Sequence, residues 1–347
     1  MAIHTPGTPS TIRPPLADGE ALQTGAGWSR RRDRGLVQLQ GEDRVRFLQG
    51  MVTCDVAALS PAGAGFGYFT SPRGQVLADA SVAAGPEALS VWVPATELES
   101  IADHLRRYIV MDRVAVAAVT VESLLVGGPR AETVLAAAGF TLPAAGDEGS
   151  AEHGEGELGG SPVSWWRASR VGVSGLRLTA TAATLDVLAV SLGKAGAREV
   201  GEEVWETVRF EAGIPRWGVD YGEGTLPQEL GEDGAVSYEK GCYLGQEVVA
   251  RIHFRGRVQR HLRALRYRGP APSVPHVLQS TEGREIRRAG RTVASPRLAA
   301  MLSLAVLHER GGEPGDRVSV VVEGVEAGEA EVLEIASLRA TTAAEPG

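Results

Sequence analysis

The chain has 347 residues, more than one ordinary domain needs, so we expect two or three folded units. Hydrophobic residues make up 43% of the sequence and charged residues 22%, close to globular averages, so each unit can bury a core. The net charge of -8 argues against nucleic acid as the main partner, because binding to phosphates depends on clustered Lys and Arg.

The cysteine count and the N-terminal sequence bear on the cellular compartment. Cys54 and Cys242 are the two cysteines, too few for a disulfide framework, which favours a reducing interior. The N-terminal residues lack the apolar core of a secretion signal, and no window approaches the roughly 18 apolar residues of a membrane span. We therefore expect a cytoplasmic protein without membrane contact.

The N-terminal part is predicted to be an arm followed by a strand-rich unit. Residues 1–25 are rich in Pro, Thr, Gly and Ala and predict a flexible arm, and residues 26–256 predict one region of two subdomains. In the first subdomain, alternating apolar residues predict strands, and apolar residues at helical spacing predict helices. The predicted strands are 36–40, 65–70, 76–82, 89–93 and 114–121, and the predicted helices are 45–51 and 97–108.

The second subdomain is expected at about residues 123–200. Within it, residues 143–162 are acidic and rich in glycine, so they cannot support a core and predict a disordered insertion. The other predicted elements are a strand at 124–126, a helix at 130–138, strand-like sequence at 164–178 and a helix at 183–195.

The last third of the chain has a different pattern. A helix at 202–212 ends at a Gly-Ile-Pro stop, and after residue 256 short strand candidates alternate with Gly and Pro turns. Residues 257–338 therefore predict a separate small antiparallel β-barrel, and residues 339–347 a disordered tail. Together with the mixed strands and helices before it, the pattern predicts an α+β multi-domain fold with mixed and antiparallel sheets.

Residues 240–247, Lys-Gly-Cys-Tyr-Leu-Gly-Gln-Glu, combine a thiol, two glycines and a lysine in eight positions, and we call them the octet. Cys242 follows Lys240 by two positions, and a nearby cation lowers a thiol pKa from its free value of about 8.5 by stabilising the thiolate. Gly241 and Gly245 allow backbone shapes that a Cβ would forbid. The alternative is a simple turn whose cysteine is a small, inert core residue.

Other chemistry receives less support from the sequence. The seven histidines show no HxxxH spacing and there is no CxxC motif, so no metal site can be argued. A dyad of Cys242 with His253 is conceivable, but nothing in their spacing demands it. Residues 251–268 are rich in arginine and contain no acid, so an anionic ligand could dock there, or these arginines could equally form the solvated face of strands.

The octet resembles the signature of the YgfZ family of folate-binding proteins, in which Lys-Gly-Cys is followed by an aromatic residue, any residue and Gly-Gln-Glu. Tyr243, Gly245, Gln246 and Glu247 fill the last positions of that pattern. The likeness extends to FLQGMVTCDV and SPRGQVLAD in the N-terminal region, and to RFEAGIPRWGVD, PQE and ARIHFRG in the central region. It covers about residues 35–335.

The resemblance implies a fold and a role. The family is related in fold to the glycine-cleavage aminomethyltransferases, which implies an aminomethyltransferase-like fold with a C-terminal barrel. It also implies a site for tetrahydrofolate or a derivative, and a role in making or maintaining iron-sulfur enzymes. The implied partners are iron-sulfur client or assembly proteins, and Cys242 would be a redox-active thiol or a transient contact of an iron-sulfur cluster.

The resemblance implies site residues as well. Trp205 is similar to the family's folate-contacting tryptophan, and Glu211 in RFEAG matches the pterin-binding glutamate of the transferases. A pterin offers a flat face to an aromatic ring and N–H donors to a carboxylate, which agrees with these residue types, although a tryptophan is also often a core residue. The anionic glutamate tail of a folate could meet Arg251, Arg255 or Arg257.

Two positions depart from the family pattern. A second folate-contacting tryptophan would fall near Arg34, and Trp28 lies six residues too early to replace it. The acidic pair of the transferases corresponds to Ala78 and Asp79 here, and the loss of one acid weakens the case for aminomethyl transfer.

Three functions therefore compete. The first is a folate-binding accessory protein for iron-sulfur proteins, and the second is an aminomethyltransferase or a related one-carbon transferase. The third is a folate-independent interaction module that uses the basic residues 251–268. For the first function we expect Cys242 and the pterin to line the same cleft, because the helix of Trp205 and Glu211 shortly precedes the octet.

Overall fold

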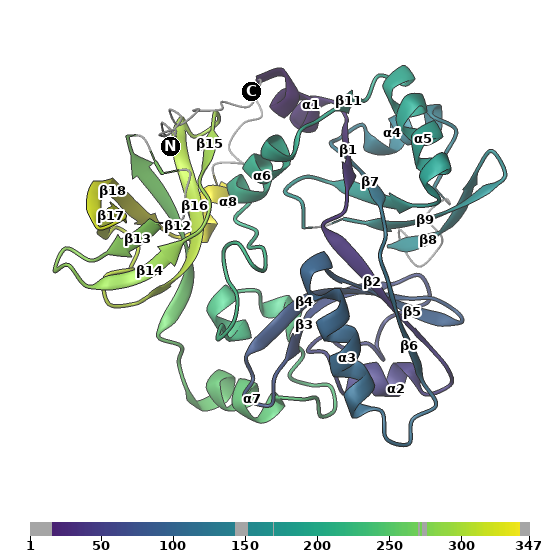
Figure 1. The fold of residues 1–347 in the computed structure, drawn as a ribbon, viewed down its shortest axis with the longest axis horizontal. Coiled ribbons are helices and arrows are strands. Elements are labelled where there is room, and N and C mark those ends of the chain that lie inside the picture. Colours follow the sequence, from purple (N-terminus) through teal and green to yellow (C-terminus); the bar gives the residue numbers. More distant parts are fainter. Residues whose placement is uncertain (1–15, 143–151, 169, 270, 273–275, 341–347) are drawn as a thin grey trace, which may run out of the picture.

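The structure is a computed structural model that describes residues 16–142, 152–168, 170–269, 271–272 and 276–340. These residues form three β-sheets with helices packed on them, and the sheets lie as three lobes around the middle of the molecule (Figure 1). One sheet contains parallel and antiparallel neighbours and two are antiparallel, which confirms the predicted α+β class with mixed and antiparallel sheets.

The first sheet has five strands in the order β3-β4-β5-β2-β6 and is antiparallel. Its strands are β2 (Arg34–Gln40), β3 (Ala64–Thr70), β4 (Val76–Ala84), β5 (Ala88–Pro94) and β6 (Ala115–Val119), and its helices are α2 (Arg44–Gln49) and α3 (Leu98–Tyr108). Buried and partly exposed residues alternate along β2, as the sequence predicts for a half-buried strand. Leu48 of α2 and Leu105 of α3 are fully buried against this sheet.

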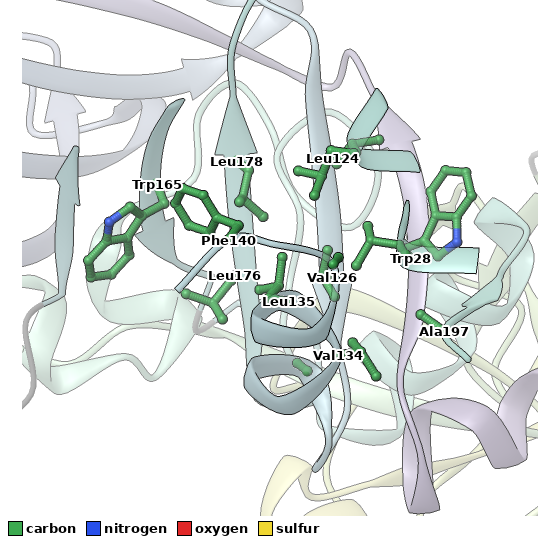
Figure 2. Close-up of a cluster of buried hydrophobic side chains, with 14 of the residues drawn as sticks. Trp28, Leu124, Val126, Val134, Leu135, Phe140, Trp165, Leu176, Leu178 and Ala197 are labelled. Carbon is green, nitrogen blue, oxygen red and sulfur yellow. The ribbon is translucent and has the colours of Figure 1, made fainter. Parts of the chain in front are cut away.

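The second sheet has six strands in the order β11-β1-β7-β10-β9-β8, with one parallel pair, β1 and β11. Its strands are β1 (Gly27–Arg31), β7 (Ser123–Gly127), β8 (His153–Leu158), β9 (Ser161–Arg167), β10 (Gly175–Thr179) and β11 (Arg198–Glu199), and its helices are α4 (Ala131–Ala137) and α5 (Ala182–Lys194). Figure 2 shows apolar side chains of β7 and β10 pointing at Val134 and Leu135 of α4. Because β1 leads almost directly into β2, the two sheets are joined at these strands.

Part of the predicted arm forms a helix. Residues Leu16–Thr24 form α1, and Leu22 is fully buried beside Val204 and Trp205 of α6 (Glu202–Glu211). Leu22 docks this helix, and the average composition of the segment does not reveal such a single contact. Residues 1–15 of the predicted arm lie outside the described residues.

The second half of the predicted insertion is ordered, and the prediction was wrong there. Residues 153–158 form β8, and β9 begins at Ser161. A Cβ on Gly156 would lie 2.8 Å from the ring of Phe140, and one on Gly154 would lie 3.1 Å from the ring of Trp165. The glycines of this segment therefore make room for two core rings, a use that composition does not distinguish from flexibility. Residues 143–151 lie outside the described part of the chain.

The third sheet is C-terminal and antiparallel, and it curls into a half-barrel (Figure 1). Its strands are β12 (Arg260–Arg268), β13 (His276–Gln279), β14 (Glu285–Ala289), β15 (Val293–Ser295), β16 (Ala300–His308), β17 (Arg317–Val322) and β18 (Val325–Leu333). The short strands β13 and β15 were not predicted. Helix α8 (Ile335–Ala340) covers the start of the predicted tail, and residues 341–347 are not described. The exact domain boundaries stay predictions.

The octet lies on the segment that links the second sheet to the third. After α6 this segment contains two 3-10 turns, Pro227–Leu230 and Asp233–Ala235, and then α7 (Gln246–Arg255). Helix α7 lies beside β3 and β4 (Figure 1), where a Cβ on Gly74 would be 3.1 Å from Val248. The octet is thus held against the first sheet.

Candidate functional site

Lys240 fixes the start of the octet to the first sheet. Its Nζ donates hydrogen bonds to the carbonyl oxygens of Gln49, Val52 and Cys54, at 2.7, 2.6 and 2.7 Å. Burial lowers the pKa of Lys240 to about 8, so the amine is largely protonated at neutral pH. All three N–H donors are used on carbonyls, so the structure assigns Lys240 an anchoring role and no hydrogen bond to the thiol of Cys242.

The rest of the octet backbone is also held in place. Leu244 donates its N–H to the carbonyl of Gly50, and its own carbonyl accepts a hydrogen bond from the hydroxyl of Thr70. Gly245 has a φ of 84°, and a Cβ there would lie 2.4 Å from the carbonyl oxygen of Ser71, so glycine is required. Tyr243 is buried, and its ring centroid lies 5.1 Å from the Lys240 Nζ.

The two thiols have opposite environments. Cys54 is 6% exposed, and burial raises its pKa to about 11, as expected for an inert core thiol. Cys242 is exposed and stands next to the exposed Gly241. The octet is therefore a fixed loop that presents one thiol to solvent, rather than a turn with a buried cysteine. Gln246 and Glu247 begin α7 and follow this loop directly.

Trp205 lines a cavity between the first and second sheets. The other aromatic walls are Trp92 and Trp166, whose rings stack with centroids 3.7 Å apart. The cavity has a volume of about 70 Å³, room for a few water molecules. The Nε1 of Trp205 is buried and has no hydrogen-bond partner among the described residues. Glu206, which was not among the predicted site residues, also lines the cavity.

Arginines dominate the polar wall of this cavity, but each makes an ion pair with an acid. Glu206 pairs with Arg209 and Arg216, each at 2.8 Å, and Asp33 pairs with Arg177 at 2.6 Å. Neighbouring charges and hydrogen bonds therefore lower the pKa of Glu206 in spite of its burial, which by itself would raise that pKa. The arginines of the wall are Arg31, Arg34, Arg167, Arg170, Arg177, Arg209 and Arg216.

Glu211 does not line the Trp205 cavity. Its carboxylate accepts hydrogen bonds from the hydroxyl of Ser295 and, at 3.2 Å, from Nε of Arg297, both in the C-terminal part of the chain. Residues at 205 and 211 of one helix are about 120° apart around the helix axis, which places them on different faces of α6. The carboxylate chosen from the sequence therefore joins α6 to the third sheet, and Glu206 is the carboxylate beside Trp205.

A buried polar network, which was not predicted, occupies the middle of the molecule. Asp79 of β4 is fully buried and pairs with Arg34, and it accepts a hydrogen bond from the hydroxyl of Tyr221 at 3.2 Å. Close by, Glu232 accepts hydrogen bonds from Tyr68 and Arg170. Burial raises the pKa of both tyrosines well above the ordinary value, so their hydroxyls stay protonated donors.

The predicted site residues thus fall in separate places. Trp205 lines the cavity between the first two sheets, whereas Cys242 and Lys240 belong to the octet and do not line it. Arg251 and Arg255 are exposed on α7, as is Arg257 just beyond it, and none of these three lines the cavity either. The expectation that Cys242 and Trp205 share one cleft is not met by this cavity.

Among the residues that the structure describes, no cluster of three or more His, Cys, Asp or Glu is arranged to hold a metal ion. None of the helices in the described part of the chain has the length and apolar character that a membrane crossing requires.

Comparison with solved structures defines the class of fold. The aminomethyltransferase T of the glycine cleavage system from Bartonella henselae superposes with a TM-score of 0.79, covers 92% of this chain and 88% of that chain, and is 20% identical. The chain therefore has an aminomethyltransferase-like fold, as predicted.

Sequence comparison defines the family. Residues 17–240 match the family model of the GCVT N-terminal domain. The tRNA-modifying protein YgfZ of Serratia proteamaculans is 30% identical over 273 residues, 77% of this chain and 79% of that protein. The protein of the same name from Yersinia pseudotuberculosis is 29% identical over 307 residues, 86% of this chain and 87% of that protein. The chain belongs to the GCVT family and to its YgfZ-type members.

Proposed function

We propose that the chain is a tetrahydrofolate-binding accessory protein that supports iron-sulfur enzymes, including enzymes that modify tRNA. The observation that carries the proposal is the octet, which is fixed at several points and yet exposes the thiol of Cys242. A thiol of this kind is suited to reversible bonds with another molecule, either as a disulfide or as a transient cluster ligand. The tRNA-modifying function in the names of the YgfZ relatives agrees with such a role.

The Trp205 cavity supports a folate site by its chemistry. It offers indole faces for a flat ring, an unused N–H on Trp205, and the carboxylate of Glu206, which can accept N–H donors of a pterin once it is partly released from its arginines. The cavity volume of about 70 Å³ is small beside the roughly 300–1,000 Å³ of typical ligand pockets, so we propose that its wall moves outward when a pterin binds. Each wall arginine already has an acidic partner, so the aromatic faces are the main attraction.

Aminomethyl transfer is the weaker candidate. Asp79, the remaining acid of the transferase pair, is fully buried and held by Arg34 and Tyr221. A carboxylate held in this way is poorly placed to exchange a proton with a substrate, because it would first have to break an ion pair in the interior. We therefore favour binding without one-carbon transfer, and the enzymatic alternative predicts methylene-tetrahydrofolate formation from an aminomethylated lipoyl carrier.

Titration of tetrahydrofolate into the purified protein tests the folate site. We expect saturable binding that weakens at least about fivefold in Trp205→Ala, since stacking on an aromatic side chain contributes roughly 1–3 kcal/mol. Trp205→Phe keeps an aromatic ring and should weaken binding less. This variant keeps the test valid if Trp205→Ala fails to fold. Glu211→Gln is the matched control, because this carboxylate lies outside the cavity. Equal affinity of the wild type and both Trp205 variants would remove Trp205 from the site, and absence of binding would refute the folate proposal.

A further inference from the structure

His253 and Phe254, which are exposed on helix α7, form a cluster of aromatic rings with Tyr238, which lies just before the octet. Phe254 is 68% exposed. The rings of Tyr238 and His253 stack with centroids 3.7 Å apart, and Phe254 meets them edge-on at 5.9 and 4.8 Å. Large exposed apolar rings that neighbouring rings hold in place are typical of protein interfaces, in which aromatic residues and arginine are enriched.

Positive charge surrounds these rings. Arg251 and Arg255 are exposed and lie four residues apart on α7, so they project from the same face. Neither makes an ion pair or a hydrogen bond with any residue that the structure describes. The ion pair of Arg257 with Glu309 is long, at 3.5 Å, and the arginine side chain is 81% exposed. Arg251 and Arg255 are therefore cationic groups without a close acidic partner among the described residues.

The face is also close to the thiol. Cys242 lies four residues before the first residue of α7. A helix of ten residues is about 15 Å long. A standard interface covers about 800 Å² on each partner, a patch wider than that length, so one partner can cover the helix and reach Cys242.

We propose that the face of α7 formed by Arg251, Phe254 and Arg255 docks a partner protein through an acidic surface and brings that protein to Cys242. The inference rests on the proposed function, because it names the kind of partner on which the thiol acts. The two cations would steer an acidic surface toward the helix, and Phe254 would be the apolar anchor. Arg251 and Arg255, which the sequence offered as partners of a folate tail, are thereby assigned to a protein partner.

A protein fits this face better than a nucleic acid does. One face of each ring in the Tyr238 and His253 stack is already covered by the other ring, which leaves less surface for base stacking. A protein can confine its acids to the patch that meets Arg251 and Arg255, whereas a nucleic acid carries a phosphate on every nucleotide and would place some of them beside the exposed acids Glu239 and Glu247.

Thiol exchange with designed peptides tests the proposal. The probes are one Glu-rich and one Lys-rich peptide of equal length, each with a single cysteine in a disulfide with 2-thiopyridine. The Cys242 thiolate attacks the peptide sulfur, a new S–S bond joins protein and peptide, and 2-thiopyridone leaves with the electron pair of the broken S–S bond. The absorbance of the released 2-thiopyridone gives the reaction rate. This rate is divided by the rate at which the same peptide reacts with glutathione. Cys242→Ser identifies the reacting residue.

We expect the normalised rate of the Glu-rich peptide to exceed that of the Lys-rich peptide at least about tenfold at low salt, and the ratio to approach one near 1 M salt, where the Debye length is about 3 Å. The double variant Arg251→Glu with Arg255→Glu should reverse the preference. Arg130→Glu with Arg317→Glu changes the net charge equally at exposed sites, just before α4 and on β17, and should leave the preference for the Glu-rich peptide unchanged. Phe254→Ala should slow a Glu-rich peptide that contains leucine, but not its alanine counterpart.

The outcomes separate this proposal from the proposed function. If Cys242 reacts with neither peptide, the role of the thiol in the proposed function is refuted. If Cys242 reacts equally fast with both, the docking face is refuted while the reactive thiol stands. If a short single-stranded RNA protects Cys242 from glutathione-pyridyl disulfide, and the Glu-rich peptide shows no preference, the protein partner is overturned in favour of nucleic acid.

Discussion

Replacing Lys240 by Met should lower the free energy of unfolding by about 3 kcal/mol or more, because three buried carbonyl oxygens lose a charged hydrogen-bond donor together. Urea denaturation measures the change, as a lower midpoint with an unchanged slope. Amide hydrogen exchange should also rise at the octet, since Lys240 joins it to the end of α2.

Lys194 supplies the control for this experiment. It is the other lysine of the chain and lies exposed in the last turn of α5. Lys194→Met should change the unfolding free energy by no more than about 0.5 kcal/mol. A Lys240→Met variant as stable as Lys194→Met would show that the ammonium does not anchor the octet.

Replacing Arg34 by Met should cost about 3–5 kcal/mol, because it leaves the carboxylate of Asp79 buried without its cation. The double variant Arg34→Met with Asp79→Asn should recover a large part of this loss, since no unpaired charge then remains in the interior. The free energies of unfolding of the wild type, the two single variants and the double variant form the cycle that measures the coupling.

Arg32→Met is the matched control for Arg34→Met. Arg32 also makes an ion pair, with Glu122 at 3.0 Å, but its side chain is 78% exposed. An exposed pair of this kind is worth about 1 kcal/mol or less. Strictly additive effects of the Arg34 and Asp79 variants would contradict a coupled pair at the centre of the molecule.

Much of the fold could be predicted from local pattern. The apolar alternation in 36–40, 65–70 and 76–82 predicted β2, β3 and β4 correctly, because it depends only on neighbours in the sequence. Helix α1 and strand β8 were missed, because each is stabilised by contacts with distant residues, such as Leu22 with α6 and Gly156 with Phe140. Such contacts cannot be predicted from the composition of a short segment.

The site was less predictable for the same reason. The octet was found because its residues are contiguous, but the carbonyl partners of Lys240 lie 186 to 191 residues away in the sequence. The ion pair of Arg34 with Asp79 and the hydrogen bond of Glu211 with Ser295 were not predicted, because the partners in each pair are also far apart in the sequence. Glu206 could have been predicted, since it directly follows Trp205 in the sequence. Glu211 was chosen instead because it lies in the RFEAG segment that resembles the family motif.

The central claim is that Cys242 acts on iron-sulfur proteins from a loop that is otherwise structural. The most direct measurement is the activity of iron-sulfur enzymes, and the amount of an iron-sulfur-dependent tRNA modification, in a bacterium whose own YgfZ-type protein has been deleted and replaced by this chain. Gly241→Ala is the control, because Gly241 is exposed and a Cβ there meets no atom within 4 Å. At equal protein levels, we predict that Cys242→Ser leaves both readouts at the level of the deletion strain, while Gly241→Ala restores them. Full restoration of both readouts by Cys242→Ser would contradict the claim.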